Sequence, residues 1–207
     1  MPVTISGSTG ISGVNGSAGT PALIGSDADT GIFLAAGQVS ASVNGTAGNV
    51  PLVSGTSQAS TSGTSIDFTG IPSWVKRITV MFTGCSRSGT SDPLIQLGDA
   101  GGFETTGYLG AGSNVGTTSV ATSGFTTGFG LNLGGTASIV YHGTVSVFLI
   151  GANTWACSGV LARSDATGTG LTGGSKTLSD TLTQIRITHV NGTDTFDAGS
   201  INILYEG

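Results

Sequence analysis

The feature that most constrains the fold is a two-residue alternation of hydrophobic and polar side chains along short stretches of the chain. In residues 75–83, Ile78, Val80 and Phe82 fall on one face of an extended backbone. The same alternation recurs in residues 144–150, 183–190 and 200–206. No hydrophobic stripe of helical spacing persists, because glycine or a β-branched residue interrupts nearly every window. The pattern predicts antiparallel strands with one face in water.

Further strands are expected where short apolar runs are bounded by glycine-containing turns. These runs are residues 64–68, 93–97, 105–110, 117–121, 125–133 and 154–163. Together they suggest about eight to ten short strands, which is typical of an all-β, antiparallel, jelly-roll-like β-sandwich. A closed barrel is the second interpretation. An immunoglobulin-type sandwich is the third, because no Cys…Trp…Cys spacing occurs.

The first fifty residues have a different character, and we expect them to form a separate unit. Two short apolar patches, residues 31–35 and 39–43, are too small to bury a core by themselves. Residues 54–64 are rich in serine, threonine and glycine and carry no apolar anchor, as in a flexible linker. The expected organisation is therefore an extended N-terminal attachment or trimerisation segment (1–53), a linker (54–64) and a sandwich head (65–207).

A glycine occupies every third position near the start of the chain, at Gly7, Gly10, Gly13, Gly16 and Gly19. Glycine at this spacing lets three extended chains approach a common axis, because only hydrogen fits there. Pro21 is the only proline next to the run, so an independent collagen helix is not expected. The run is consistent with either an ordered, glycine-packed trimeric segment or a flexible tether.

Composition excludes several classes of partner. Only 8% of the 207 residues are charged, the net charge is −5, and there are six lysines and arginines. Binding to nucleic acid or to an anionic membrane surface needs basic clusters, so neither partner is expected. The longest apolar run, residues 139–152, is interrupted by His142 and is shorter than the ~20 residues of a membrane helix.

No constellation of catalytic, metal-binding or cofactor-binding residues assembles in the sequence, so we expect no enzyme activity, no metal and no cofactor. Cys85 and Cys157 lack metal-ligand spacing and are interpreted as small buried side chains, although a single disulfide stays open. His142 and His189 lie within strand-like runs, and His189, which shares a face with Ile185 and Ile187, is interpreted as a satisfied or partly exposed sheet residue. The acidic stretch of residues 26–31 lacks the remaining ligands of a calcium loop.

Two glycine-rich stretches, residues 97–113 and 161–176, are expected to be the longest loops of the head. Loops at the end of a sandwich commonly carry recognition. The side chains in them that suit contact with sugar hydroxyls are Asp99, Glu104, Tyr108, Arg163 and Asp165. Plain solvated turns are the alternative interpretation of both stretches.

Several blocks of the chain resemble domains of tail fibres and other virion appendages of tailed bacteriophages. One block is "SGTSIDFTGIPSWVKRITVMFTGCSRSGTS", which continues into "IQLGDAGGFETTGY". The preceding "GTPALIGSDADTGIFLAAGQVSASVNGT" is similar to a segment that often precedes the distal domain of such proteins. The two blocks span most of residues 19–110, and "IPSWVKRITV" is the more specific part.

This resemblance implies a homotrimeric structural protein on a virion, assembled in the host cytoplasm. It also implies attachment to other virion proteins through the N-terminal segment and contact between the head and the host surface, with a surface glycan as one such partner. The family supplies no binding residues to transfer. Because the chain lacks a long coiled-coil or β-helical shaft, a capsid decoration (cement) protein or head fibre is the alternative. A lectin or carbohydrate-active enzyme is a further class, which the scarcity of acid and base residues disfavours.

Overall fold

The computed structural model describes residues 23–24, 31–35, 38–43, 46–47 and 52–207. The chain divides into two compact units, Met1–Pro51 and Leu52–Gly207. The five triplet glycines and the acidic stretch at 26–31 lie outside the described residues.

The N-terminal unit contains one four-stranded antiparallel sheet in the order β1-β2-β3-β4. Its strands are β1 (Leu23–Ile24), β2 (Gly31–Ala35), β3 (Gln38–Val43) and β4 (Thr46–Ala47). The two apolar patches recognised in the sequence form β2 and β3, which pair with each other.

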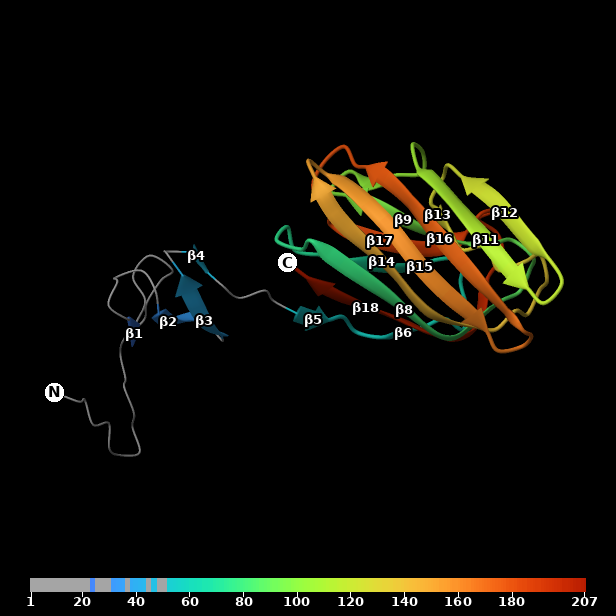
Figure 1. The fold of residues 1–207 in the computed structure, drawn as a ribbon, viewed down its shortest axis with the longest axis horizontal. Coiled ribbons are helices and arrows are strands. Elements are labelled where there is room, and N and C mark those ends of the chain that lie inside the picture. Colours follow the sequence, from blue (N-terminus) through green and yellow to red (C-terminus); the bar gives the residue numbers. More distant parts are fainter. Residues whose placement is uncertain (1–22, 25–30, 36–37, 44–45, 48–51) are drawn as a thin grey trace, which may run out of the picture. The chain divides into compact units, whose positions relative to one another are not determined.

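The second unit, which we call the head, consists of two antiparallel sheets with no helix among its described residues (Figure 1). The smaller sheet has five strands in the order β10-β9-β17-β7, with β13 also paired to β9. Their bounds are β7 (Ile66–Thr69), β9 (Pro93–Asp99), β10 (Gly102–Phe103), β13 (Phe129–Gly130) and β17 (Gln184–His189).

The larger sheet has nine strands in the order β12-β11-β16-β15-β14-β8-β18-β5, with β6 also paired to β18. Their bounds are β5 (Leu52–Ser54), β6 (Gln58–Ala59), β8 (Arg77–Arg87), β11 (Leu109–Gly116), β12 (Val120–Phe125), β14 (Tyr141–Gly151), β15 (Thr154–Arg163), β16 (Gly168–Thr177) and β18 (Phe196–Glu206). The chain passes repeatedly from one sheet to the other, as in a jelly roll.

One hydrophobic core fills the space between the two sheets. Ile78 and Val80 of β8 contribute to it from the larger sheet, and Ile185 and Ile187 of β17 contribute from the smaller one, all four fully buried. Alternate residues of each strand point inward, because successive side chains of a strand face opposite sides. The prediction of an antiparallel β-sandwich is thus confirmed, and β15 has the bounds expected from the sequence.

The expected linker is part of the head, which corrects that expectation. Within residues 54–64, β6 pairs with β18, and the buried hydroxyl of Ser60 donates to the carbonyl of Ala198 at 2.8 Å. Strand pairing uses backbone groups, so a segment without large apolar side chains can still join a sheet edge.

The two expected loops are also largely strand, so that prediction was wrong. Residues 168–177 form β16 between β15 and β11, and residues 109–116 form β11. The glycines are there because other backbone segments pass close by: a Cβ on Gly170 would lie 2.6 Å from the carbonyl oxygen of Asn132, and one on Gly112 would lie 2.8 Å from that of Gly130. Glycine in a strand interior marks such close approaches as well as turns.

Both cysteines are buried free thiols, as the sequence interpretation expected. Burial raises the pKa of Cys157 to about 12, so this thiol stays protonated at neutral pH. His189 corrects the expectation of a satisfied or partly exposed side chain, because its ring is buried and neither ring nitrogen has a hydrogen-bond partner among the described residues. The ring packs against Phe196 at 4.5 Å between centroids, with the two planes tilted by 43°.

A buried ion pair joins the two sheets near one end of the head. Arg87 of β8 has a fully buried guanidinium, and its Nη1 lies 3.4 Å from the Asp92 carboxylate, just before β9. Arg87 also donates to the carbonyl oxygens of Gly134 and Thr136. The same Asp92 oxygen accepts from the backbone N–H of Leu133 at 3.2 Å, so the pair also holds the segment after β13 in place.

Candidate functional site

The outer face of the five-stranded sheet carries a polar depression with a volume of about 410 Å³. Its floor is formed by residues of β9 and β17 that alternate with core residues: Gln96 and Arg186 are cross-strand partners and face outward. The lining is rich in hydroxyl, amide and guanidinium groups. It comprises Thr64, Ser65, Leu94, Gln96, Thr105, Thr127, Arg186, Thr188, His189, Val190, Asn191 and Gly192.

Arg186 is the charged group of this depression, and its orientation is fixed on two sides. Its Nε and Nη2 donate to the two carboxylate oxygens of Asp67, at 2.8 and 2.7 Å. The guanidinium carbon lies 4.1 Å from the centre of the Phe103 ring. The hydrogen bonds to Asp67 raise the pKa of Arg186, so it is charged at any accessible pH. Because the ion pair uses Nε and Nη2, the two N–H groups of Nη1 remain as donors for other acceptors.

The polar side chains around Arg186 are held by the backbone of neighbouring segments. Gln96 donates through Nε2 to the carbonyl of Thr127 at 2.8 Å, and the Thr188 hydroxyl donates to the carbonyl of Thr64 at 2.9 Å. Each retains an acceptor atom, the amide oxygen or the hydroxyl oxygen. The arrangement can bind a small ligand that offers several hydroxyl or carbonyl groups.

Three of the five residues predicted to contact a ligand meet at one end of the head, but in a polar cluster whose side chains bind one another. The Ser179 hydroxyl lies 2.6 Å from an Asp99 carboxylate oxygen and 2.9 Å from one of Glu104. The hydrogen bond from Ser179 lowers the pKa of Asp99. Lys176 forms an ion pair with Glu104, and its Nζ lies 5.5 Å from the centre of the Tyr108 ring.

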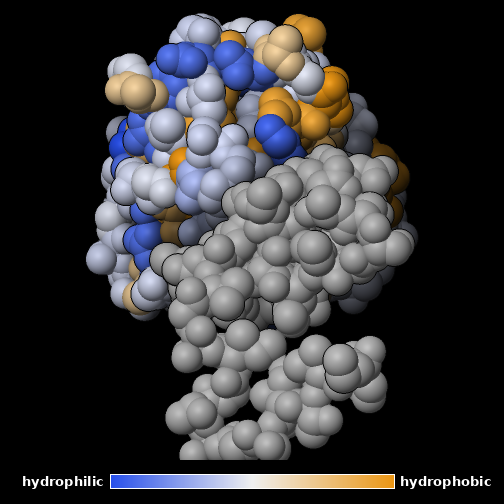
Figure 2. Space-filling view, turned by 90° about the vertical axis from the view of Figure 1, so that its left-hand side faces the viewer, coloured by the Kyte–Doolittle hydropathy of each residue, from blue (hydrophilic) through white to orange (hydrophobic). Residues whose placement is uncertain are grey.

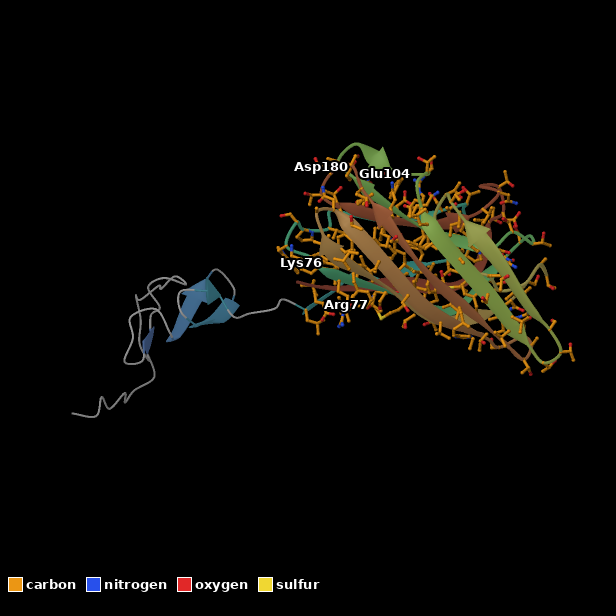
Figure 3. The ribbon with its side chains drawn as sticks, turned by 45° about the horizontal axis from the view of Figure 1, so that its top comes forward. Lys76, Arg77, Glu104 and Asp180 are labelled. Carbon is orange, nitrogen blue, oxygen red and sulfur yellow. The ribbon has the colours of Figure 1, made fainter. Side chains whose placement is uncertain are left out.

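Asp99 and Tyr108 are buried, which corrects the expectation that they contact a ligand at the surface. The backbone N–H of Leu97 donates to the Tyr108 hydroxyl at 2.7 Å. In Figure 3, Glu104 lies beside Asp180, which follows Ser179 in the connection between β16 and β17. The cluster therefore ties that connection to the end of β9 and is structural.

Arg163 and Asp165 lie elsewhere, at the turn between β15 and β16. Arg163 Nη2 lies 2.5 Å from the Asp165 carboxylate, and this carboxylate accepts from the backbone N–H of Val140 at 3.1 Å. The length of β16 separates the pair from Lys176, about 26 Å at the rise of a strand. The structure thus does not bring the five predicted residues into one site.

A second hollow, of about 520 Å³, lies between the edges of the two sheets. It is lined by Ser54, Gly55, Thr56, Gln58, Asp67, Phe68, Thr69, Gly70, Ile71, Ile203 and Tyr205. Its only charged residue is Asp67, whose carboxylate is already paired with Arg186, so this hollow offers fewer groups for a polar ligand than the depression does.

Within the described residues, no three histidine, cysteine, aspartate or glutamate side chains gather as metal ligands would. Nor does that part of the chain hold a helix long and apolar enough to cross a membrane. Comparison with known proteins finds no family model, no curated protein and no solved structure that matches the chain.

Proposed function

We propose that the chain is a structural virion protein of a tailed bacteriophage, a homotrimeric tail-fibre-like appendage that contributes to attachment to the host surface. The observation that carries the proposal is the organisation in two units, in which a small N-terminal sheet precedes a β-sandwich head. The resemblance of residues 19–110 to virion appendage domains supports the same assignment.

In this proposal the head faces the host and the N-terminal unit joins other virion proteins. The polar depression suits a surface glycan, because Arg186, Gln96 and the surrounding threonines offer both donors and acceptors to sugar hydroxyls. The head presents few charges, which fits a surface polysaccharide better than a highly charged partner.

Electron microscopy of particles that contain the chain, labelled with an antibody against the head, tests the location. Label at the tail is the expected result. Label distributed over the capsid would replace this proposal by the alternative of a capsid decoration protein or head fibre. A chain found in no particle would refute both.

Binding of the full chain to purified host-surface polysaccharide tests the depression. Replacing Arg186 with lysine keeps a positive charge but loses the rigid fork of donors, so we expect binding to weaken about tenfold. Arg163→Lys is the matched control, because Arg163 is also paired with an aspartate but lies at another end of the head. Equal binding by the two variants would exclude the depression as the glycan site.

A further inference from the structure

The outer face of the nine-stranded sheet is nearly free of charge over several neighbouring strands. On β14, β15, β16 and β11, the outward positions along their described lengths hold no aspartate, glutamate, lysine or arginine. Charged outward side chains lie on the neighbouring strands, where Arg77 of β8 and Glu206 of β18 pair at one end and Asp197 of β18 is exposed at the other. We call the outward surface of β14, β15, β16, β11 and β12, together with that of β8 beyond Arg77, the uncharged face.

Hydrophobic side chains stand exposed in the middle of the uncharged face. Val160 and Leu171 are cross-strand partners that expose 52% and 43% of their surface. Around them lie mostly glycine, alanine, serine and threonine, which leave the sheet smooth enough for close contact. Figure 2 views one end of the head with this face toward the right, and hydrophobic atoms gather on that side.

The free edge of this sheet is a second unusual feature. Among the described residues, β12 pairs only with β11, and five of its six residues are exposed, with neither a charge nor a proline among them. Monomeric proteins normally protect an edge strand with charges, prolines or bulges, because its unpaired backbone groups otherwise pair with another chain. The edge is continuous with the uncharged face.

From these observations we infer that the uncharged face packs against a second copy of this chain. Six strands at about 4.8 Å spacing and some eight residues of about 3.3 Å each give a surface of roughly 750 Å². This is close to the roughly 800 Å² that each partner buries in a stable protein interface. The core of such an interface is depleted in charged residues, as this face is.

The absence of charge on this face favours a second copy of the chain as its partner. Any charge that a partner brought against this face would lose its hydration and find no opposite charge in return. A copy of the chain carries the same uncharged surface. The remaining surface holds the charges of the chain, whose net value is −5, and it therefore repels the same surface of another copy. Like faces that meet make a two-fold contact, which joins two chains, whereas a trimer joins unlike surfaces. The inference therefore goes beyond the trimer of the proposed function and names a separate contact between copies.

Sedimentation velocity of the full chain at micromolar concentration, with native mass measurement, tests the inference. The wild-type chain is expected to be an oligomer. The double variant Val160→Asp and Leu171→Asp is expected to lose this contact and to sediment as a smaller species than the wild type, because it buries carboxylates in the contact. Val190→Asp is the matched control: Val190 exposes 47% of its surface just after β17, away from this face, and its variant should stay oligomeric.

A cysteine variant measures proximity directly. Thr144→Cys, on the uncharged face beside Val160, should form a disulfide-linked dimer under mild oxidation, whereas Val190→Cys should not. The native cysteines are buried and give little background. Unchanged tryptophan fluorescence of the double aspartate variant shows that its head is folded.

The outcomes separate this inference from the proposed function. A double aspartate variant of unchanged size, without cross-linking through residue 144, would overturn the uncharged face as an interface and leave a virion oligomer held by another surface. A monomeric wild-type chain would overturn the interface and the trimer together. The virion location is decided independently by the microscopy.

Discussion

Replacing Gly174 of β16 with alanine tests why a glycine-rich stretch forms a central strand. A Cβ added at Gly174 would lie 2.5 Å from the carbonyl oxygen of Leu109 and 2.7 Å from the Cα of Gly110. Both atoms belong to the backbone of β11, so neither can move away as a side chain could. The next residue along the strand behaves differently, because a Cβ at Gly173 would meet only the carbonyl oxygen of Cys157, at 3.7 Å.

The two substitutions therefore differ in the folded state alone. Each removes the same backbone freedom from the unfolded chain, which by itself stabilises a protein by about 0.4–1 kcal/mol. Forcing an extra methyl group into a filled site costs about 1–3 kcal/mol. We expect Gly173→Ala to be neutral or slightly stabilising, and Gly174→Ala to be less stable than Gly173→Ala by about 1–3 kcal/mol.

Urea unfolding followed by tryptophan fluorescence measures this difference, because Trp74 and Trp155 both lie in the head. For a unit of this size the melting temperatures of the two variants should differ by about 2–4 °C for each kcal/mol. If Gly174→Ala were as stable as Gly173→Ala, the close approach of β11 to β16 would not explain the glycine.

Three further predictions concern buried charges and pH, each measured by urea unfolding. Arg87→Met should destabilise the head by about 3–5 kcal/mol, because it leaves the Asp92 carboxylate without its cation. Adding Asp92→Asn to this variant should recover part of the lost stability. If no stability were recovered, the result would argue against the ion pair. Ser179→Ala should destabilise the head at pH 7 but less at pH 3, because the hydrogen bond from Ser179 lowers the pKa of Asp99. The stability that this hydrogen bond contributes is present above about pH 3.9 and is lost as the pH falls below that value. A loss of stability that does not change with pH would contradict this. Burial lowers the pKa of His189, so between about pH 6.5 and that lowered pKa the unfolded chain takes up a proton that the folded head does not. The wild type should therefore lose stability from pH 7 to pH 5 more steeply than His189→Phe. Parallel plots of stability against pH for the two proteins would refute His189 as the cause.

The sandwich could be predicted from the sequence because its core strands alternate in hydrophobicity. Ile78, Val80 and Phe82 face inward as expected, and the same holds for Ile185 and Ile187. Residues 168–177 carry no such alternation, since their inward positions are mostly glycines that other backbone segments cover. Hydrophobic alternation cannot reveal such a strand, because the strand packs closely against other backbone segments only where it carries no side chain.

The polar groups of the head could not be assembled from the sequence for a different reason. Ser179 lies far along the chain from Asp99 and Glu104, and only the sheet topology brings them together. Arg186 and Asp67 could have been noticed, because each alternates with inward hydrophobic residues and so had to face outward. Their pairing across two strands depends on a register that the sequence does not state.

The position of β18 in the larger sheet affects how the head can fold. β18 lies between β8 and the short strands β5 and β6, so the first and last segments of the head pair side by side. Contacts between residues so distant in sequence close large loops and slow folding. Until β18 is in place, one edge of β8 stays open and able to pair with another chain. During synthesis, the head is therefore most prone to aggregate just before its final strand leaves the ribosome.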